Sequence, residues 1–253
     1  PNEYRNYIRL GKMDYLYDKV ETYDKLKDII RGKSTPDGLS NIQKGMSDIE
    51  HHMLHFLDNH DEQRLASPEF AGTPERGKPL MVVSTTLSTS PTMIYFGQEV
   101  GEAGNEDAGF GKHSRTSIFD YIGVPNHQKW MNDGKFDGGQ LSESEKNLRD
   151  FYRRLLNFSI KSPALMGSFQ EIQSENRQNN VGYDELLYSY VRWSENQKLV
   201  IIANFSSEKT SEFELKIPAD VIAKWNLKDG EYKLTDQLYQ QNAVVLKVEN
   251  GIG

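Results

Sequence analysis

The sequence predicts a mixed fold in which an α/β region is followed by an all-β region. Up to about residue 163, short apolar runs alternate with amphipathic helical patterns, which is typical of a parallel sheet covered by helices. From residue 164 on, strand-like runs follow one another without helical patterns between them, which is typical of an antiparallel β-sandwich. We therefore expect two domains, residues 1–163 and residues 164–253.

The α/β region contains three expected strands and two expected helices between them. The apolar runs that predict the strands are 13–17, 53–57 and 93–96. The first helix is expected to begin at Thr22 as its N-cap and to end at Gly32. The second is expected over about residues 78–89, ended by Pro91.

The last helix of this region has the clearest pattern in the chain. Ser142 and Glu145 have the spacing of a capping box, and apolar residues then follow on one face until Pro163 ends the helix. Before this helix, residues 101–140 are rich in Gly, Asp and Asn and predict a long loop, and a loop of this length is usually either functional or a sign that its elements are misread.

Five strand-like runs, separated by turn-forming residues, predict the β region. They are 186–193, 198–205, 212–217, 232–238 and 243–248.

Composition excludes several classes of protein. The 253 residues include no cysteine, so disulfides, thiolate metal sites and cysteine nucleophiles are excluded, while the cellular compartment stays open. The net charge of -7 comes from mixed charges without a basic stripe, which argues against nucleic acid as a partner. No apolar run approaches the roughly 20 residues of a membrane span. The start at Pro1, without an initiator Met, is expected of a piece of a longer protein.

The strongest candidate for chemistry is the run from Asp58 to Arg64. It follows an apolar strand and contains carboxylates, a histidine, amides and a guanidinium within seven residues. Loops after the carboxyl ends of barrel strands form active sites, and carboxylates with hydrogen-bonding neighbours suit the cleavage of a glycosidic bond. A solvated loop with a helix cap is the competing interpretation.

Two motifs carry a resemblance to a known family. The run 56–61, Phe-Leu-Asp-Asn-His-Asp, resembles the fourth conserved region of the alpha-amylase family, glycoside hydrolase family 13. The run 91–99, Pro-Thr-Met-Ile-Tyr-Phe-Gly-Gln-Glu, resembles the eighth strand of that family, with Phe96 in place of the common Tyr. Runs 114–121 and 128–130 are similar to the loop after the barrel in bacterial maltodextrin-acting members. The resemblance implies the C-terminal part of a (β/α)8 TIM barrel, about strands 6–8, before the β-sandwich.

The resemblance also implies roles for single residues. Asp61 corresponds to the carboxylate that stabilises the transition state, and His60 to the histidine that hydrogen-bonds the same sugar. Asn59 would support the loop, and Arg64 would help to position the cluster or bind substrate. Trp130, with Phe119 and Tyr121, is a candidate for stacking on sugar rings, although core packing competes.

Two family residues are absent from the sequence. The nucleophilic Asp after the fourth strand and the acid Glu after the fifth have no counterpart, and Asp18 lies in the wrong place to replace either. We therefore expect a fragment of an enzyme that acts on α-1,4-glucans with retention, inactive alone, because retention needs two carboxyl groups roughly 5 Å apart. Its expected partners are a maltooligosaccharide or α-glucan and the missing part of the barrel, or a second copy covering the open strand edges.

Other interpretations remain open. The chain could be a non-catalytic carbohydrate-binding or assembly module with a degenerate barrel. A serine hydrolase using His60 and Asp61 is disfavoured because no G-x-S-x-G elbow is present. We expect no cofactor and no metal: some members of the family bind calcium, but the acids of residues 101–111 do not have EF-hand spacing, and His51, His52 and His55 lead into a strand.

Overall fold

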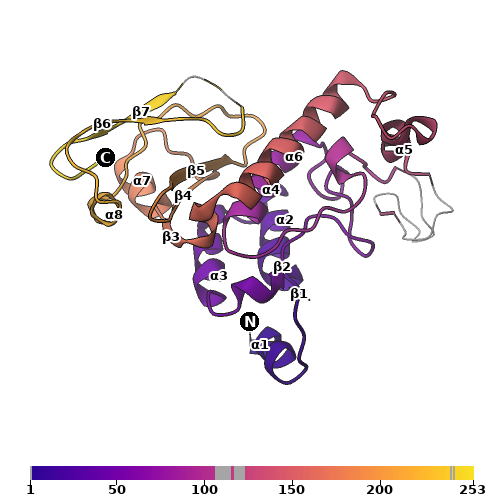
Figure 1. Cartoon of the computed structure of the whole chain (residues 1–253), viewed down its shortest axis with the longest axis horizontal. Coiled ribbons are helices and arrows are strands. Elements are labelled where there is room, and N and C mark those ends of the chain that lie inside the picture. Colours follow the sequence, from indigo (N-terminus) through magenta and orange to yellow (C-terminus); the bar gives the residue numbers. More distant parts are fainter. Residues whose placement is uncertain (1, 106–114, 117–122, 240, 242) are drawn as a thin grey trace.

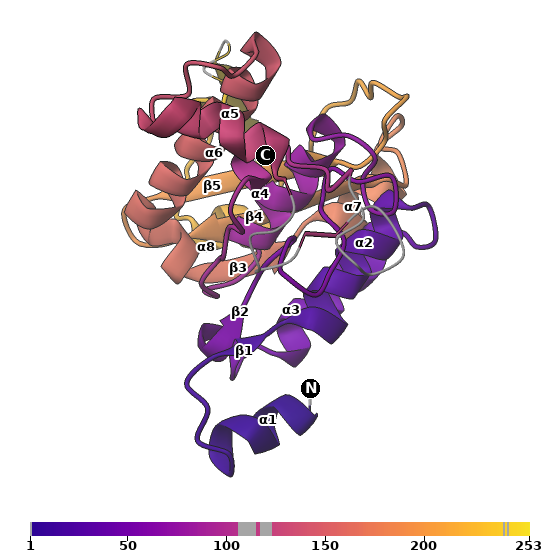
Figure 2. The ribbon, with the colours of Figure 1, turned by 90° about the vertical axis from the view of Figure 1, so that its right-hand side faces the viewer.

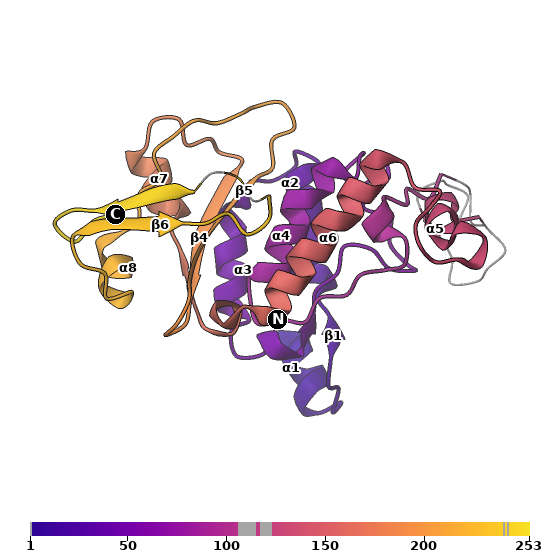
Figure 3. The same ribbon diagram turned by 45° about the horizontal axis from the view of Figure 1, so that its top comes forward.

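The computed structural model describes residues 2–105, 115–116, 123–239, 241 and 243–253. An α/β part and a β part lie side by side, with the long helix α6 (Glu143–Lys161) running along the α/β part (Figure 1). In Figure 3, α6 lies beside α4 (Lys78–Thr86), and α2 (Asp24–Ile30) belongs to the same α/β part. The expected order of an α/β region before a β region is confirmed at this level.

Three parallel chain segments form the sheet of the α/β part. Strand β1 (Leu16–Tyr17) pairs with β2 (Met53–Leu54) in parallel, and the next residue after β2, His55, forms a parallel bridge to Thr92. Figure 2 shows β1 and β2 next to each other, with α1 (Asn2–Arg9) beyond them. The three expected strands are therefore neighbours in the expected order and orientation.

These strands are shorter than the sequence predicts. Residues 13–15, 56–57 and 93–96 belong to no strand, and the third segment contributes only its bridge at Thr92. The strands are short because a β-strand extends only as far as hydrogen bonds to a neighbouring strand continue. Within the described residues, β1 has a strand neighbour on one side only. The structure shows this short parallel array, and the expected portion of a barrel stays a prediction.

Helix α2 corresponds to the first helix expected from the sequence, but the prediction that Thr22 is its N-cap was wrong. A π-helical turn, Lys19–Tyr23, precedes α2, and its N-cap is Asp18. The Oδ1 atom of Asp18 accepts a hydrogen bond of 3.1 Å from the backbone N–H of Thr22. Asp18 directly follows β1, so its carboxylate, and not the Thr22 hydroxyl, accepts from the free N–H groups at the start of the helix. Gly32 follows the helix with a φ of 69°, as a glycine terminator does.

The other helices agree in part with the predictions. The capping box of α6 is confirmed, with the N–H of Glu145 3.3 Å from Oγ of Ser142 and the N–H of Ser142 2.7 Å from Oε2 of Glu145. Helix α4 ends at Thr86, earlier than expected. Further helices are α1, α3 (Leu39–Gly45) and α5 (Pro125–Met131). Short 3-10 turns lie at Pro36–Gly38, Glu50–His52, Glu75–Gly77, Gln98–Val100, Asn132–Gly134 and Pro163–Met166.

The β part holds two antiparallel sheets. The strands β3 (Ser168–Glu171), β4 (Leu187–Trp193) and β5 (Lys198–Asn204) form one sheet in that order, and β6 (Gly230–Leu234) pairs with β7 (Val244–Val248) in the other. Both sheets contribute to one apolar cluster that also includes α8 (Ala219–Lys224). The antiparallel strands are confirmed, whereas α8 and α7 (Gln173–Asn179) were not expected.

The prediction of a strand over 212–217 was wrong. The backbone of Lys216 is held by the side chain of Asn176 in α7, through an N–H···Oδ1 bond and an Nδ2–H···O bond, both of 2.8 Å. The N–H of Ile217 donates to the carbonyl of Gly253 at 2.6 Å. These contacts satisfy the backbone groups without a strand partner.

The main apolar core extends across residue 164. Tyr188 and Tyr190 of β4 belong to the same buried cluster as Leu80 and Leu87 from the chain segment of α4. The Tyr190 hydroxyl lies 2.6 Å from Oγ1 of Thr86, and that of Tyr188 lies 2.8 Å from Oγ of Ser40. The sheet of β4 therefore packs directly on the α/β part, and the boundary at residue 164 stays a prediction.

Arg192 is a buried cation in this contact. Its side chain is 1% exposed and donates to the carbonyl oxygens of Leu87 at 2.8 Å, Thr86 at 3.4 Å, Gly167 at 3.2 Å and Leu165. Because the last carbonyls of a helix have no partner within the helix, Arg192 satisfies the end of α4 from the neighbouring sheet. Burial lowers its pKa, since the charged form is desolvated.

Candidate active-site loop

The segment from Asp58 to Arg64 follows the carboxyl end of β2, and the buried carboxylate of Asp58 holds its two ends together. Asp58 is 0% exposed, and its Oδ1 atom accepts a hydrogen bond from the backbone N–H of Leu65. Its Oδ2 atom lies 3.2 Å from Nη1 of Arg64, which is also fully buried. The two ends of the segment are therefore tied together by one side chain.

Arg64 joins this loop to the end of the third parallel segment. Its Nη1 atom donates to the carbonyl of Phe96 at 2.8 Å, and Nε donates to Oγ1 of Thr116 at 2.7 Å. Its guanidinium carbon lies 4.5 Å from the ring centre of Tyr95. The geometry suits a positioning role, because the guanidinium lies inside the fold and already contacts a carboxylate and a carbonyl.

Asn59 turns the chain so that His60 and Asp61 face outward. Its Oδ1 atom accepts from the backbone N–H groups of Asp61 at 2.9 Å and Glu62 at 2.8 Å, which forms an Asx turn. The side chain of Asp61 is 76% exposed and that of His60 is 41% exposed, with Nε2 of His60 3.4 Å from Oδ2 of Asp61. The loop presents an imidazole and a carboxylate side by side to any ligand.

The phenol of Tyr95, in the third parallel segment, has a raised pKa. Burial is the main cause, Arg64 opposes the rise, and the carboxylates of Asp58 and Asp61 add to it.

The loop is also held against α2 and the π-helical turn that precedes it. The carboxylate of Glu62 accepts from the Tyr23 hydroxyl at 3.2 Å and lies 3.5 Å and 3.8 Å from the ammonium groups of Lys19 and Lys27. The ring of Tyr23 stacks on Phe56 with 4.8 Å between centroids. Glu62 is therefore engaged in holding the loop against α2.

Asp18 takes part in a second buried pair, away from solvent. Its Oδ2 atom lies 3.3 Å from Nε2 of His55, and Nδ1 of His55 donates to the carbonyl of Ser84 at 2.7 Å. Burial opposes ionisation of Asp18, but the contacts of His55 and Thr22 hold its pKa below the usual value. The pair links β1, β2 and α4. Among the described residues no three ligating side chains lie close enough to hold a metal ion.

Asp58 is expected to titrate near neutral pH. Burial raises its pKa to about 6, and Arg64 opposes this rise. The carboxyl of an unfolded chain ionises near pH 3.9, so between about pH 4 and pH 6 the unfolded state loses its proton first. The contribution of Asp58 to stability therefore falls as pH rises through this window and is constant above it.

The measurement is urea unfolding of the wild type and of Asp58→Asn at several pH values. We expect the free energy of unfolding of the wild type, relative to the variant, to fall by roughly 2–3 kcal/mol between pH 4 and pH 7. A difference that is constant over this range would contradict the prediction. A carbon NMR titration of the Asp58 carboxyl supplies an independent midpoint.

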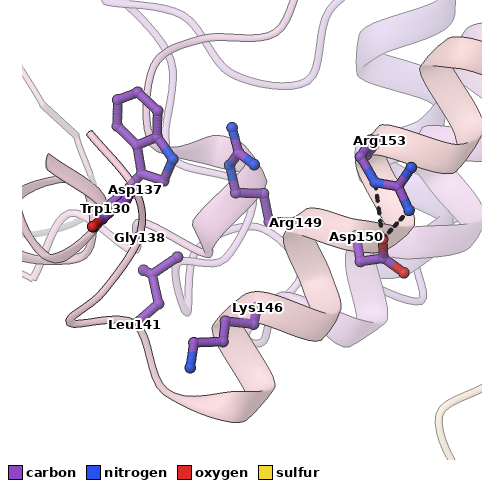
Figure 4. A pocket seen from close by; sticks show the side chains of 8 residues that line it. All are labelled: Trp130, Asp137, Gly138, Leu141, Lys146, Arg149, Asp150 and Arg153. Carbon is purple, nitrogen blue, oxygen red and sulfur yellow. Dashed lines mark hydrogen bonds and ion pairs between the residues drawn. The ribbon is translucent and has the colours of Figure 1, made fainter. Parts of the chain in front are cut away.

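Trp130 lies outside this loop. It belongs to α5, where its half-buried ring stacks on His127 with 5.7 Å between centroids, and His127 in turn contacts Phe96 at 5.3 Å. Trp130 lines a surface pocket of about 220 Å³ that contains no residue of the 58–64 segment (Figure 4). The structure thus brings His60, Asp61 and Arg64 together but places Trp130 elsewhere.

Some of the other residues predicted from the sequence to be functional lie outside the residues that the structure describes. Phe119 and Tyr121 lie outside the described residues, as do residues 106–111 of the acidic loop. Glu102 of that loop is buried and accepts from the N–H of Asn126 at 3.0 Å. It also contributes to the raised pKa of Asp58, a role that no motif in the sequence indicated.

Comparisons with known proteins identify a shared fold. Neither a protein-family model nor a curated protein matches the sequence. The solved structure of an AmyP variant in complex with maltotriose is similar over 94% of this chain and 47% of its own length, with a TM-score of 0.58 and 18% identity. A trehalose-6-phosphate hydrolase from Bacillus licheniformis has a TM-score of 0.48 and 15% identity, over 92% of this chain and 50% of its own. The chain spans about half the length of these structures. None of the described helices is long and apolar enough to cross a membrane.

Proposed function

We propose that this chain is the C-terminal part of a retaining glycoside hydrolase. More particularly, we propose a member of the alpha-amylase family, glycoside hydrolase family 13, that acts on α-1,4-glucans such as maltodextrins. The observation that carries this proposal is the exposed Asp61 beside His60, on a loop tied by Asp58 and Arg64 between the ends of neighbouring parallel segments. The likeness to the fold of a protein solved with maltotriose supports an oligosaccharide as ligand.

In this proposal Asp61 stabilises the transition state. Cleavage of a glycosidic bond develops positive charge on the sugar ring, and hydrogen bonds from ring hydroxyls to a carboxylate strengthen as this charge develops. His60 donates a hydrogen bond to the same sugar from one nitrogen. Both side chains are accessible for this, because they are 41% and 76% exposed and the contacts that build the loop are made by Asn59, Asp58 and Arg64.

The nucleophile and the general acid are proposed to lie on strands that this chain does not contain. The other carboxylates near Asp61 are engaged: Asp58 is buried against Arg64, and Glu62 is held by Tyr23 and two lysines. A retaining mechanism needs an attacking carboxylate and a proton donor roughly 5 Å apart, and Asp61 cannot be both. The chain alone is therefore proposed to be inactive.

The missing strands would cover the open side of β1. Tyr17 of β1 is 42% exposed, and its neighbours Tyr15 and Val20 are 61% and 66% exposed. A strand edge with exposed apolar side chains beside it favours association. The proposed partner is the preceding part of the barrel, and self-association is the alternative when that part is absent.

The test compares this chain with a longer one that includes the preceding coding sequence. We expect no turnover of a soluble maltodextrin by the 253-residue chain, and turnover by the longer chain with α-anomeric products in NMR spectra. Robust turnover by the short chain would refute its inactivity. If both chains bind maltooligosaccharides and neither cleaves them, the chain belongs to a non-catalytic carbohydrate-binding module.

A further inference from the structure

Tyr95 follows the third parallel segment, next to the proposed active-site loop. The bridge between His55 and Thr92 joins this segment in parallel to the one that continues into the loop. Neighbouring segments that run in the same direction leave a sheet at the same edge. Tyr95 and Asp61 both follow the bridge, so both belong to the edge at which the loop lies.

The ring of Tyr95 is held in a fixed position. The guanidinium carbon of Arg64 lies 4.5 Å from its ring centre, and the ring of Phe96 lies 4.6 Å away at an angle of 61°. The backbone carbonyl of Tyr95 accepts a hydrogen bond of 3.0 Å from the N–H of Gln98. These contacts fix the place of the hydroxyl oxygen at the tip of the ring.

This hydroxyl oxygen is buried and has no hydrogen-bond partner within the described residues. The same holds for the Nη2 atom of Arg64, which belongs to the group stacked on the ring. Buried polar groups without partners are rare, because each has lost its hydrogen bonds to water. A phenol O–H and a guanidinium N–H are both donors. The stack of Tyr95 and Arg64 therefore favours an acceptor nearby, and a carboxylate suits two such donors best.

Asp61 is the carboxylate that can supply this acceptor. Burial is the main cause of the raised pKa of Tyr95, and the charges of Asp58 and Asp61 add to it. Both oxygens of Asp58 are already engaged, one by a backbone N–H and one by Arg64. The side chain of Asp61 is 76% exposed, and its recorded contact in the described structure is to Nε2 of His60 at 3.4 Å. It can therefore turn without breaking the contacts that build the loop.

We propose that Tyr95 is a positioning residue for Asp61, a role that rests on the proposed function. When a sugar takes the hydrogen bond of His60, the Asp61 carboxylate turns to the Tyr95 hydroxyl, which donates to one of its oxygens. The other oxygen then faces the sugar. A fixed donor behind the carboxylate keeps its negative charge where positive charge develops on the sugar ring.

The kinetic test is a double-mutant cycle in the longer enzyme that includes the preceding coding sequence. Tyr95→Phe removes only the hydroxyl. We expect kcat on maltodextrin to fall about tenfold with little change in KM, because a hydrogen bond to a charged group is lost in the transition state. In the Asp61→Ala background, which has no side-chain acceptor, the same change is expected to lower kcat less than about twofold. Equal losses in both backgrounds would overturn the proposal.

Tyr183→Phe is the matched control for the loss of a phenol hydroxyl. The Tyr183 hydroxyl lies 2.7 Å from Oγ of Ser189 in the β part, so this variant loses an existing hydrogen bond outside the loop. We expect it to lower the melting temperature and to leave kcat unchanged. Tyr95→Phe is expected to do the reverse, because its hydroxyl has no partner in the ligand-free fold. A lower melting temperature for Tyr95→Phe with unchanged kcat would assign Tyr95 a structural role instead.

An NMR experiment on the 253-residue chain separates this inference from the proposed function. His60→Ala removes the partner that Asp61 has in the ligand-free fold. Asp61 is then expected to take one rotamer, seen in the couplings between its Hα and Hβ protons. Adding Tyr95→Phe is expected to average these couplings. If the longer enzyme has no turnover but the couplings respond, the proposed function fails and the contact between Tyr95 and Asp61 stands. Couplings that are the same with and without the Tyr95 hydroxyl overturn the inference.

Discussion

Replacing Asp61 by Asn in the longer, barrel-completed enzyme that we propose is expected to lower kcat on maltodextrin about 10²–10³-fold, the loss typical of one group that stabilises developing charge. The carboxylate is 76% exposed, and the only ion-pair partner recorded for it in the described structure is His60. The fold therefore does not depend on it. The amide keeps the size of the side chain but removes the negative charge that a sugar with oxocarbenium character would meet.

Steady-state kinetics and thermal melting together check this expectation. We expect an unchanged melting temperature and a loss in kcat that exceeds any change in KM, because the contact strengthens in the transition state. Asp28→Asn is the matched control, since Asp28 is an exposed aspartate on α2 outside the loop. If Asp61→Asn keeps more than about a third of the wild-type kcat, the assigned role is wrong.

Replacing Arg192 by Met is expected to lower the free energy of unfolding by about 3 kcal/mol, because hydrogen bonds to a buried charged group contribute roughly 1.5–3 kcal/mol each and lost partners remain desolvated. Arg192 donates to carbonyl oxygens of Thr86, Leu87 and Gly167 as well as Leu165, in a place that is 1% exposed. Methionine fills similar space but donates nothing, so the end of α4 loses its partners.

Denaturant unfolding measures this loss, with Arg153→Met as the control. Arg153 is also an arginine, but its side chain is 62% exposed and pairs with Asp150 one turn earlier on α6. Exposed pairs of this kind contribute about 0.2–1 kcal/mol. We expect Arg192→Lys to be destabilised too, because an ammonium group cannot span carbonyls on both sides as a planar guanidinium does. Equal stability of Arg192→Met and Arg153→Met would contradict the role of Arg192.

The order of helices and strands could be predicted from the sequence because it depends on patterns of neighbouring residues. Apolar runs and the Ser142 capping box are patterns of neighbouring residues, and both correspond to observed elements. The lengths of the strands could not be predicted, because they depend on partners far along the chain. The same holds for 212–217, where Asn176 binds the backbone 40 residues away and replaces a strand partner.

The site was predictable to a similar degree. The position of the 58–64 cluster after an apolar strand indicated the loop, and the amide of Asn59 was assigned a supporting role that its hydrogen bonds match. The burial of Asp58 and Arg64 was not deducible, because it depends on Phe96 and Thr116, whose proximity is set by the tertiary fold. Sequence spacing does not record which of several charged residues faces inward.

The contact between β4 and α4 limits how this protein could exchange modules during evolution. The Tyr190 hydroxyl contacts Thr86 at the end of α4, where Arg192 donates to the carbonyl of Leu87, and the Tyr188 hydroxyl contacts Ser40 of α3. A C-terminal module from another protein would lack these side chains, so the carbonyl groups at the end of α4 would be buried without hydrogen-bond partners. Successful recombination at residue 164 would therefore require compensating substitutions on both sides of the junction.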